Sequence, residues 1–400
     1  MIVQHRPPLH LTYCLNIHRG EGWSDNLAAI REKAVAVKQR IAPDQWFGLG
    51  LRLSAHAAER LLAEPARVDE ARELFEREQL YPFTVNAFPY GRFHAGPVKE
   101  SVYSPDWRTP ERRDYTLRVS DVFTNFLPPE VDGSISTVPG SFKPWIESGE
   151  DSRMMARNLA TVVAYLSALR DDTGQEIHIG LEPEPDCFLE TTAETVAFFN
   201  DVIFTAGTDE VVRLLGCDRG RAESTLRRHL GVCLDTCHVA LQYEDPLEAL
   251  RTYRAQGIRI SKIQLSAALS GPGSPETWEA LKAFNEPVYL HQVKAILASG
   301  GMAAWYDLPT AIEEGPTMTD IVEVRVHFHV PLFFNNAGAL GSTVTTLTPD
   351  FFHELRTGLC AHLEIETYTF DVLPPELNPG DVVKSICREY SWVLQQLGAQ

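Results

Sequence analysis

Short apolar runs alternate along the chain with longer stretches in which apolar residues recur at helical spacing. This rhythm is typical of repeated strand and helix units, which build a parallel sheet covered by helices. The apolar runs predict strands at 10–16, 47–53, 83–88, 133–138, 176–182, 231–235, 258–265 and 362–366. About eight such strands are enough to close a (β/α)₈ barrel, so an α/β fold of the TIM-barrel class is expected.

Helices are predicted between these strands at 25–41, 67–78, 110–126, 153–170, 192–204, 209–227, 246–255, 275–284, 349–358 and 382–397. The rhythm breaks at 286–348, between the seventh and eighth strands. Alternating apolar residues at 321–330 suggest an extra strand there. We therefore expect one TIM-barrel domain over 1–400, with 286–348 as a long insertion over the C-terminal, catalytic face of the barrel.

Size and composition agree with a soluble barrel protein. The 400 residues exceed a bare barrel of roughly 250 residues by enough for such an insertion. No apolar run approaches the roughly 20 residues that cross a bilayer, so no membrane span is expected. The first residues lack the pattern of a signal peptide, which favours a cytoplasmic location. Seven cysteines without paired spacing indicate reduced thiols rather than a disulfide framework.

The charge balance bears on possible partners. A formal net charge of −18 repels a phosphate backbone, so nucleic acid is not an expected partner. Arginines at 108, 112, 113 and 118 could still supply a local basic patch, although a solvated charged face is the simpler interpretation of them.

The stretch GVCLDTCH at 231–238 carries the strongest chemical signal. Alternate side chains of a strand share a face, so Cys233 and Asp235 point the same way. A carboxylate at the C-terminal end of a buried strand needs a partner or a cation, and His238 is a natural co-ligand. Alternatively, Asp235 caps the next helix and His238 lies in its first turn. The residues alone leave both interpretations open.

Other predicted strands also end on polar residues, where barrel enzymes place their chemistry. Glu182 follows the fifth strand, and Glu184 lies beyond it in the loop. Gln264 ends the seventh strand, either as a weak metal ligand through its carbonyl oxygen or as a hydrogen-bonding wall residue. Glu366 lies at the mouth of the eighth strand, and Glu364 lies deeper in the barrel.

Several histidines and asparagines are further candidates. His327 and His329 share a face of the extra strand, where they can bind one ion or frame a substrate. The first strand delivers Tyr13, Asn16 and His18 to the mouth of the barrel, the third brings Asn86 and His94, and the insertion contributes His291.

The segment GVCLDTCHVALQYED resembles the metal-site segment of endonuclease IV and its relatives in the xylose-isomerase-like TIM-barrel superfamily, where the Asp and His of a DTCH element bind metal. GLEP around Glu182 and the IE-T context of Glu366 resemble the first and last metal-binding glutamates of that superfamily. The resemblance implies a divalent ion, Zn²⁺, Mn²⁺, Co²⁺ or Mg²⁺, held by Glu182, Asp235, His238, Gln264 and Glu366. It also implies catalytic roles for Glu182 and Glu366, and substrate contacts from His18, Asn86, His94, His291, His327 and His329.

The chain also departs from endonuclease IV-like enzymes. Asn86 and Val138 stand where histidine ligands are expected, His327 replaces the acid of a DxH element, and Gln264 replaces another histidine. A three-metal phosphodiesterase site is therefore not expected. The remaining set resembles the single-metal ring of sugar isomerases and epimerases, which suits one hard or borderline divalent cation.

Longer motifs, namely TYCLNIHRGEGW, EPVYLHQV, VHFHVPLF and HLEIETYTFDVLP, resemble the EboE group, the TIM-barrel component of bacterial eboABCDEF-type metabolite-traffic clusters. This resemblance covers most of the chain. It implies a small-molecule metabolite as ligand and possible partner proteins of the same pathway, without a particular chemistry.

Three functions fit these observations. The first is a metal-dependent isomerase or epimerase of a small polar or sugar-like metabolite, in which Glu182 and Glu366 move a proton. The second is an endonuclease IV-like metal-dependent hydrolase that uses Asp235 and His238. The third is a non-catalytic metabolite-binding or transport accessory protein, which the amide at Gln264 favours. The number of bound metal ions separates them.

Overall fold

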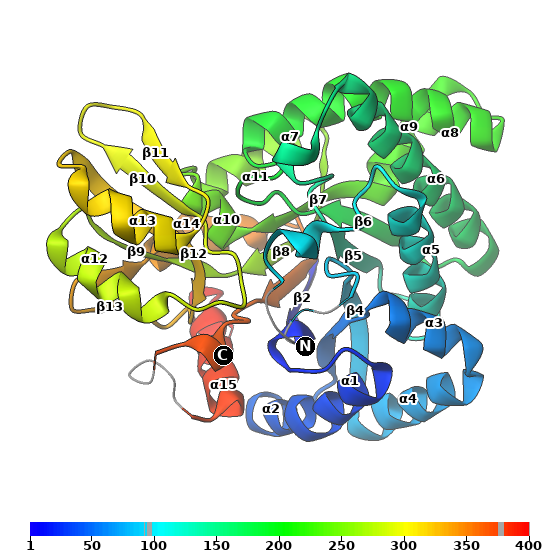
Figure 1. The fold of residues 1–400 in the computed structure, drawn as a ribbon. Helices are drawn as coiled ribbons and strands as arrows, with labels where there is room; N and C mark the ends of the chain where they lie inside the picture. Colours follow the sequence, from blue (N-terminus) through cyan, green and yellow to red (C-terminus); the bar gives the residue numbers. More distant parts are fainter. Residues whose placement is uncertain (92, 94–97, 375–379, 400) are drawn as a thin grey trace.

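Eight parallel strands close a barrel at the centre of the molecule (Figure 1). The structure is a computed structural model that describes residues 1–91, 93, 98–374 and 380–399. In pairing order, the barrel strands are β2 (Pro8–Tyr13), β15 (His362–Ile365), β8 (Arg259–Leu265), β7 (Leu230–Asp235), β6 (Ile177–Leu181), β5 (Gly133–Thr137), β4 (Leu80–Asn86) and β3 (Phe47–Arg52). The ends of this row meet through a parallel bridge between Cys14 and Gly50. The predicted (β/α)₈ TIM barrel is confirmed, with β1 (Ile2–His5) added antiparallel to β2.

Helices surround the barrel and cover the outward faces of its strands (Figure 1). The helices of the described residues are α1 (Trp23–Ala29), α2 (Val35–Ile41), α3 (Ala55–Ala63), α4 (Pro65–Glu78), α5 (Pro110–Thr124), α6 (Gly149–Thr173), α7 (Thr192–Phe198), α8 (Thr208–Leu215), α9 (Arg219–His229), α10 (Thr236–Leu241), α11 (Pro246–Ala255), α12 (Pro275–Leu281), α13 (Leu308–Glu314), α14 (Pro349–Leu355) and α15 (Val382–Gln396). Of these, α12 and α13 pack on the insertion between β8 and β15 and not on the barrel. Because helices cover one face and the barrel interior fills the other, every residue of β3, β4 and β7 is buried.

One predicted helix is wrong, because the helix expected at 209–227 is broken. α8 ends at Gly216, which adopts a left-handed conformation with φ 62°, and Asp218 caps the start of α9 by accepting from the backbone N–H of Arg221. A left-handed glycine after a helix and an aspartate before the next one are common stop and start signals. On the other side, α7 and α8 are joined by a continuous π-helical segment, Phe199–Gly207.

A second sheet lies between β8 and β15 in sequence and beside the barrel in space (Figure 1). Its antiparallel strands, in pairing order, are β11 (Met302–Trp305), β10 (Val293–Leu297), β12 (Ile321–Val330), β9 (Ala267–Pro272), β14 (Leu340–Ser342) and β13 (Asn336–Ala337). An insertion between the seventh and eighth barrel strands is present as predicted, and the extra strand at 321–330 is β12. The insertion begins before the predicted residue 286, because β9 already belongs to the second sheet. The C-terminal end of β12 brings His327 and His329 to the mouth of the barrel.

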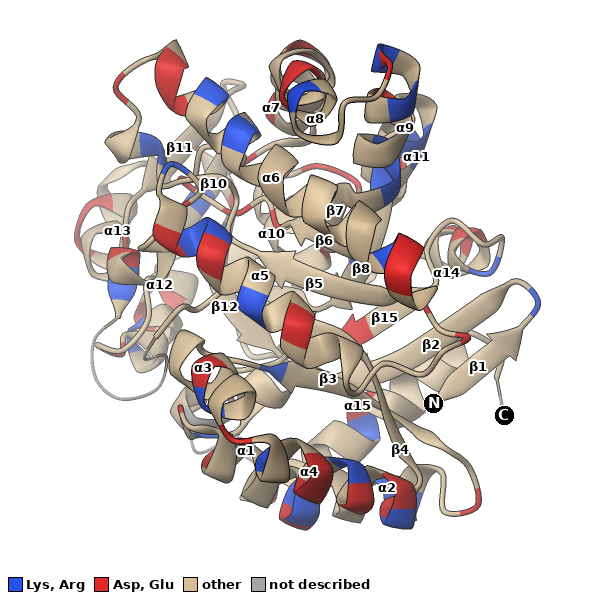
Figure 2. Ribbon diagram, turned by 90° about the vertical axis from the view of Figure 1, so that its right-hand side faces the viewer, with Lys and Arg blue, Asp and Glu red and all other residues tan. Residues whose placement is uncertain are grey.

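Charged residues of both signs share the outer helices, as Figure 2 shows for α2, α4 and α5. The arginines considered as a basic patch do not form one, because Arg112 is buried and donates to the backbone carbonyls of Ala87 and Phe88, both at 2.9 Å. Arg108 pairs with Asp106. Among the described residues, no helix combines the length and the apolar composition needed to cross a bilayer.

A buried glutamate on α15 makes the fold sensitive to pH. Burial raises the pKa of Glu389 to about 7, whereas in an unfolded chain the carboxyl ionises near pH 4.3. One oxygen accepts from the Thr367 hydroxyl at 2.7 Å and the Leu332 N–H at 3.1 Å. Between about pH 4.3 and 7 the folded protein holds a proton that the unfolded chain has lost, so the free energy of unfolding falls as pH rises through this window.

Glu389→Gln is expected to remove this dependence, because the amide keeps the accepting oxygen and cannot ionise. Above pH 7 the variant should be more stable than wild type by about 3–4 kcal/mol, and at pH 4 the two should be nearly equal. Urea unfolding at both pH values measures the difference. If the free energies of unfolding of the two proteins changed with pH in parallel, the pKa of Glu389 would not differ between the folded and unfolded states.

Candidate metal centre

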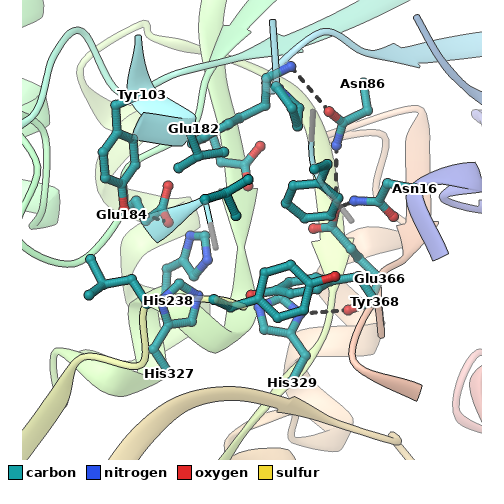
Figure 3. A pocket seen from close by; sticks show the side chains of 17 residues that line it. Asn16, Asn86, Tyr103, Glu182, Glu184, His238, His327, His329, Glu366 and Tyr368 are labelled. Atoms are coloured by element: carbon teal, nitrogen blue, oxygen red, sulfur yellow. Dashed lines mark hydrogen bonds between the residues drawn. The ribbon is translucent and has the colours of Figure 1, made fainter. Parts of the chain in front are cut away.

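The carboxyl ends of the barrel strands open into one cavity (Figure 3). All parallel strands of a TIM barrel end on the same rim, so side chains far apart in sequence meet there. The polar residues that line the cavity are Asn16, Asn86, Glu182, Glu184, His238, His327, His329 and Glu366. All of them are buried, and they lie at or just after the ends of four barrel strands, on α10 and on β12 of the second sheet.

Three carboxylates form a group at the base of this cavity, which we call the carboxylate floor; Glu182 and Glu366 line the cavity itself. Glu182 follows β6, Asp235 ends β7 and Glu366 follows β15, and one oxygen of each lies within 4.8 Å of the other two. Burial, and then the neighbouring carboxylates, raise the pKa values of Glu182 and Glu366 well above their usual range. Without a cation, these two groups are therefore held neutral, because like charges cannot share a buried site.

Asp235 has two functions in the structure, so the two interpretations of its sequence are compatible. Its Oδ1 caps α10, accepting from the backbone N–H groups of Cys237 and His238 at 2.7 and 3.1 Å, and from the Ser266 hydroxyl at 2.6 Å. Burial opposes the ionised form, but His238, His329 and the Ser266 hydrogen bond outweigh it and lower the pKa of Asp235. Oδ2 has no hydrogen-bond partner among the described residues.

Each of the three site histidines is held by its Nδ1 atom. His238 Nδ1 lies 2.9 Å from the carbonyl oxygen of Pro183, and His329 Nδ1 lies 2.7 Å from that of Glu366. His327 Nδ1 lies 2.7 Å from Oε1 of Gln292. Carbonyl oxygens only accept, so the proton sits on Nδ1 and each neutral ring presents the lone pair of Nε2. This is the tautomer that binds a metal through Nε2.

The histidines join the carboxylates in two overlapping groups. Asp235, His238 and His329 form one, and Glu184, His238 and His327 form the other, with ligand atoms within 4.8 Å of each other in each group. Burial lowers the pKa of His329 to about 4 and that of His327 well below its usual range. Both rings are therefore neutral near pH 7, as a metal ligand must be.

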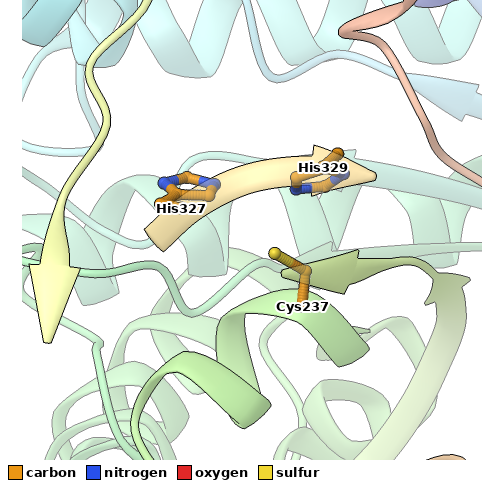
Figure 4. A group of neighbouring side chains, drawn as sticks. All are labelled: Cys237, His327 and His329. Atoms are coloured by element: carbon orange, nitrogen blue, oxygen red, sulfur yellow. The ribbon is translucent and has the colours of Figure 1, made fainter. Parts of the chain in front are cut away.

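A thiol also faces these rings. Figure 4 shows Cys237 of α10 beneath His327 and His329 of β12, and the three side chains form a further possible ligand group. Burial, and then the charge of Asp235, raise the pKa of the Cys237 thiol well above its usual range. The surroundings therefore oppose the thiolate, so the carboxylates and imidazoles are the better ligands.

Asn86 contributes a hydrogen bond at a position where a histidine ligand was expected. Its Nδ2 donates to Glu366 Oε1 at 3.3 Å, and Nδ2 of Asn16 donates to the same oxygen at 2.6 Å. The N–H of Phe88 donates to Asn86 Oδ1 at 3.1 Å, which fixes the orientation of the amide. The amides of Asn16 and Asn86 therefore position Glu366. Asn86 does so at a position where a ligand of a further metal ion was expected.

Glu184 was missed as a site residue by the sequence analysis. It lies in the loop after β6, but its N–H donates to the carbonyl of Leu189 at 3.0 Å and this turn returns the side chain to the cavity. The Tyr103 hydroxyl donates to Oε1 at 3.0 Å, while Oε2 has no partner among the described residues. Burial raises the pKa of Glu184 to about 7. The repeat EPEP was the available signal, since both glutamates have the same parity.

Other predicted site residues lie outside the cavity wall. His18 is hydrogen-bonded through Nε2 to the Tyr13 hydroxyl at 2.9 Å, and it borders a separate surface pocket. His291 lies behind His327, with its ring nitrogens 2.7 Å from the His327 carbonyl and from Glu286. Gln264 sits beside Asp235 in register, and its carbonyl oxygen accepts from the Cys233 thiol at 3.0 Å. His94 lies outside the described residues.

An ion pair lies in the barrel beneath the carboxylates. Lys262 of β8 and Glu364 of β15 form a salt bridge, and both side chains are at most 1% exposed. Gly50 of β3 gives them room, because a Cβ atom there would lie 2.1 Å from Glu364 Oε1. The Lys262 ammonium also contacts the hydroxyl of Thr84 at 3.3 Å. A pair of opposite charges therefore lies below the cavity floor.

A second histidine group lies at the opposite end of the barrel. His178 and His362 are 3.2 and 3.3 Å from the carboxylate of Asp132. The guanidinium of Arg259 is 2.6 Å from the same carboxylate and already supplies its countercharge. This group is therefore an ion-pair network at the end of the barrel that usually serves stability.

Comparisons with known proteins give similarities of fold. No family model matches the chain, and no curated protein sequence matches it. Among solved structures, it is similar to a xylose isomerase domain protein from Planctomyces limnophilus, at 14% identity, covering 98% of this chain and 97% of that one with a TM-score of 0.48. It is also similar to an IolI protein with a bound zinc atom (12% identity, 98% of each chain, TM-score 0.47).

A third similar structure is the probable 3-DHS dehydratase AsbF, involved in petrobactin synthesis, from Bacillus anthracis (13% identity, 96% of this chain and 97% of that one, TM-score 0.47). The barrel assignment of this chain rests on its own strand pairing.

Proposed function

We propose that the protein is a metal-dependent isomerase or epimerase of the xylose-isomerase-like type, acting on a small oxygen-bearing metabolite in an EboE-type metabolite-traffic pathway. The observation that carries the proposal is the set of buried acceptor atoms without partners among the described residues, Glu182 Oε2, Asp235 Oδ2, His327 Nε2 and His329 Nε2. Buried polar atoms are normally satisfied, and oxygen and nitrogen atoms of these kinds are ligands of divalent cations.

The ligand atoms suit one cation in the carboxylate floor. Glu182, Asp235 and Glu366 would hold it, and the cation would polarise a carbonyl oxygen of the metabolite. Glu184 would not need to bind it, and its free oxygen faces the same cavity. With the Tyr103 hydroxyl holding its other oxygen, Glu184 is placed to take a proton from one carbon of the metabolite and return it to another. Glu182 and Glu366 remain the other candidates for this role.

A metal-dependent hydrolase is the second candidate. It is favoured by the group Glu184, His238 and His327, which lies beside the carboxylate floor and could hold a second cation. Two cations close together activate water and stabilise a leaving oxygen in many hydrolases. The negative net charge of the chain and the burial of Arg112 speak against a nucleic acid substrate.

Metal content tests these assignments. Protein purified without chelator is expected to contain one divalent ion per chain by elemental mass spectrometry, because one ion would offset two of the three negative charges of the carboxylate group. Glu366→Gln should lower that content severalfold, whereas Glu354→Gln, at the outer surface on α14, should leave it unchanged.

Other results would favour other functions. Two or more ions, together with incision of abasic-site DNA in Mg²⁺, Mn²⁺ or Zn²⁺, would support the hydrolase. No ion as purified and none after reconstitution would overturn the metal site and favour a non-catalytic metabolite-binding protein.

A further inference from the structure

The cavity at the candidate metal centre is lined by aromatic side chains as well as by polar ones. Its largest apolar members are Phe88, Phe93, Tyr103, Tyr289, Leu290 and Tyr368. They come from the segment after β4, from the segment before β10 and from the segment after β15. Figure 3 shows Tyr103 and Tyr368 on opposite sides of the cavity, with His327 and His329 along one border. We call the six residues the aromatic wall.

The aromatic wall is continuous with the ligand atoms. Phe93, Tyr289 and Tyr368 contact one another, with ring centroids 5.2–5.5 Å apart in each pair. The ring of Tyr368 lies 4.6 Å from that of His329. A molecule whose oxygens reach the carboxylate floor therefore has its remaining atoms against these rings.

Contacts behind the aromatic wall hold it in place. The N–H of Val98 donates to the Val288 carbonyl at 3.0 Å, which joins the segment after β4 to the segment before β10. The buried guanidinium of Arg52 lies 5.5 Å from the centre of the Phe93 ring, and the N–H of Phe93 donates to Glu21 at 2.8 Å. A fixed wall of this kind is preorganised to bind a rigid ligand.

A ligand made only of hydroxyl groups does not suit this arrangement. Phe88, Phe93 and Leu290 offer no side-chain hydrogen-bond donor or acceptor, so hydroxyl groups facing them would lose water without replacement. A planar or apolar group would instead gain from leaving water. The cavity thus combines acidic side chains with an extensive apolar lining.

We propose that the metabolite is amphiphilic, with a pair of neighbouring oxygens for the metal centre joined to an aromatic or similar-sized apolar group that packs on the aromatic wall. This deepens the proposed function and rests on it. An amphiphilic metabolite of this kind differs from a free sugar, which carries an oxygen at nearly every carbon and has no apolar group to pack on the aromatic wall.

Two hydroxamic acids test the proposal, because each chelates a metal through the same pair of oxygens. Acetohydroxamic acid carries a methyl group, and benzohydroxamic acid carries a phenyl ring. Titration calorimetry with the Zn²⁺-loaded protein is expected to give a dissociation constant for benzohydroxamic acid at least about tenfold lower, since a buried ring removes far more apolar surface from water than a methyl group.

Variants separate the wall from the metal centre. Tyr289→Leu and Phe93→Leu should reduce the preference for the phenyl compound severalfold and leave acetohydroxamic acid binding unchanged. Tyr306→Leu, an exposed tyrosine of the same insertion, is the matched control and should keep the full preference. Comparing two ligands on one protein cancels any general loss of stability.

The outcomes are distinguishable. Equal binding of the two compounds would overturn the amphiphilic substrate and leave the metal centre standing, with the wall serving only to exclude water. Binding of neither compound, by a protein that also fails to take up Zn²⁺, would overturn the metal centre itself.

Discussion

Replacing Lys262 by methionine is expected to lower the free energy of unfolding by about 3–5 kcal/mol. Lys262 and Glu364 are paired inside the barrel, where neither side chain is more than 1% exposed. Methionine fills a similar volume, so the main effect is the loss of the countercharge of a buried carboxylate. Urea unfolding followed by circular dichroism at pH 7 measures the change.

The double variant Lys262→Met/Glu364→Gln provides the control. It removes both charges, so it should recover much of the stability lost in the single variant, because a neutral pair costs far less to bury. The coupling energy from the double-mutant cycle should exceed about 1 kcal/mol. Additive effects, or a loss of under about 1 kcal/mol for Lys262→Met alone, would contradict this prediction. The pair would then contribute no more to stability than a solvent-exposed salt bridge does.

This ion pair also affects the candidate metal centre. Lys262 partly offsets the burial and repulsion that raise the pKa values of Glu182 and Glu366. Glu364 acts in the opposite direction on Glu366. The pair therefore places a compensated charge below the floor of the cavity, while the excess negative charge of the three carboxylates remains for a cation.

Much of the architecture was predictable because it depends on local patterns. Buried parallel strands are short apolar runs, and a polar residue after such a run lies at the carboxyl end of the barrel wherever it occurs in the chain. Glu182, Asp235 and Glu366 follow this rule, and the structure brings their oxygens within 4.8 Å. Which side chains of a strand share a face also follows from the sequence alone, because side chains alternate between the two faces.

Other features depend on contacts between distant segments, which a local pattern does not contain. The sequence could not indicate that the loop after β6 returns Glu184 to the cavity or that Lys262 pairs with Glu364. It placed only one strand of the second sheet, because the others are short and pair with partners far along the chain. His291 resembled a site residue, yet it supports the carbonyl of His327 from behind.

The tautomers of the histidines are equally non-local. The pair His327 and His329 was visible in the sequence, but the atoms that hold their Nδ1 positions belong to Gln292 and Glu366. Those contacts decide which ring nitrogen faces the cavity. To predict metal binding by a histidine pair, one must therefore know the hydrogen-bond partners of both ring nitrogens of each histidine.

A saturating divalent ion is expected to raise the melting temperature of the wild-type protein, and Asp235→Asn is expected to abolish that gain. An ion that binds the native site and not the unfolded chain stabilises by about 2.7 kcal/mol at a hundred times its dissociation constant. For a chain of this length this corresponds to roughly 3 °C. Differential scanning fluorimetry with Zn²⁺, Mn²⁺, Co²⁺ or Mg²⁺, against EDTA, measures the shift.

In EDTA the variant should melt at or slightly below the wild-type temperature, because Asp235→Asn keeps the accepting oxygen of the helix cap but loses the ionised carboxylate that His238, His329 and Ser266 favour. Asp245→Asn is the matched control, since Asp245 caps α11 in the same way and is exposed on the outer surface. It should retain the full gain with metal. If no ion shifts the melting of the wild type and none is bound as purified, the three carboxylates are neutralised by protons, and the barrel holds its metabolite without a metal.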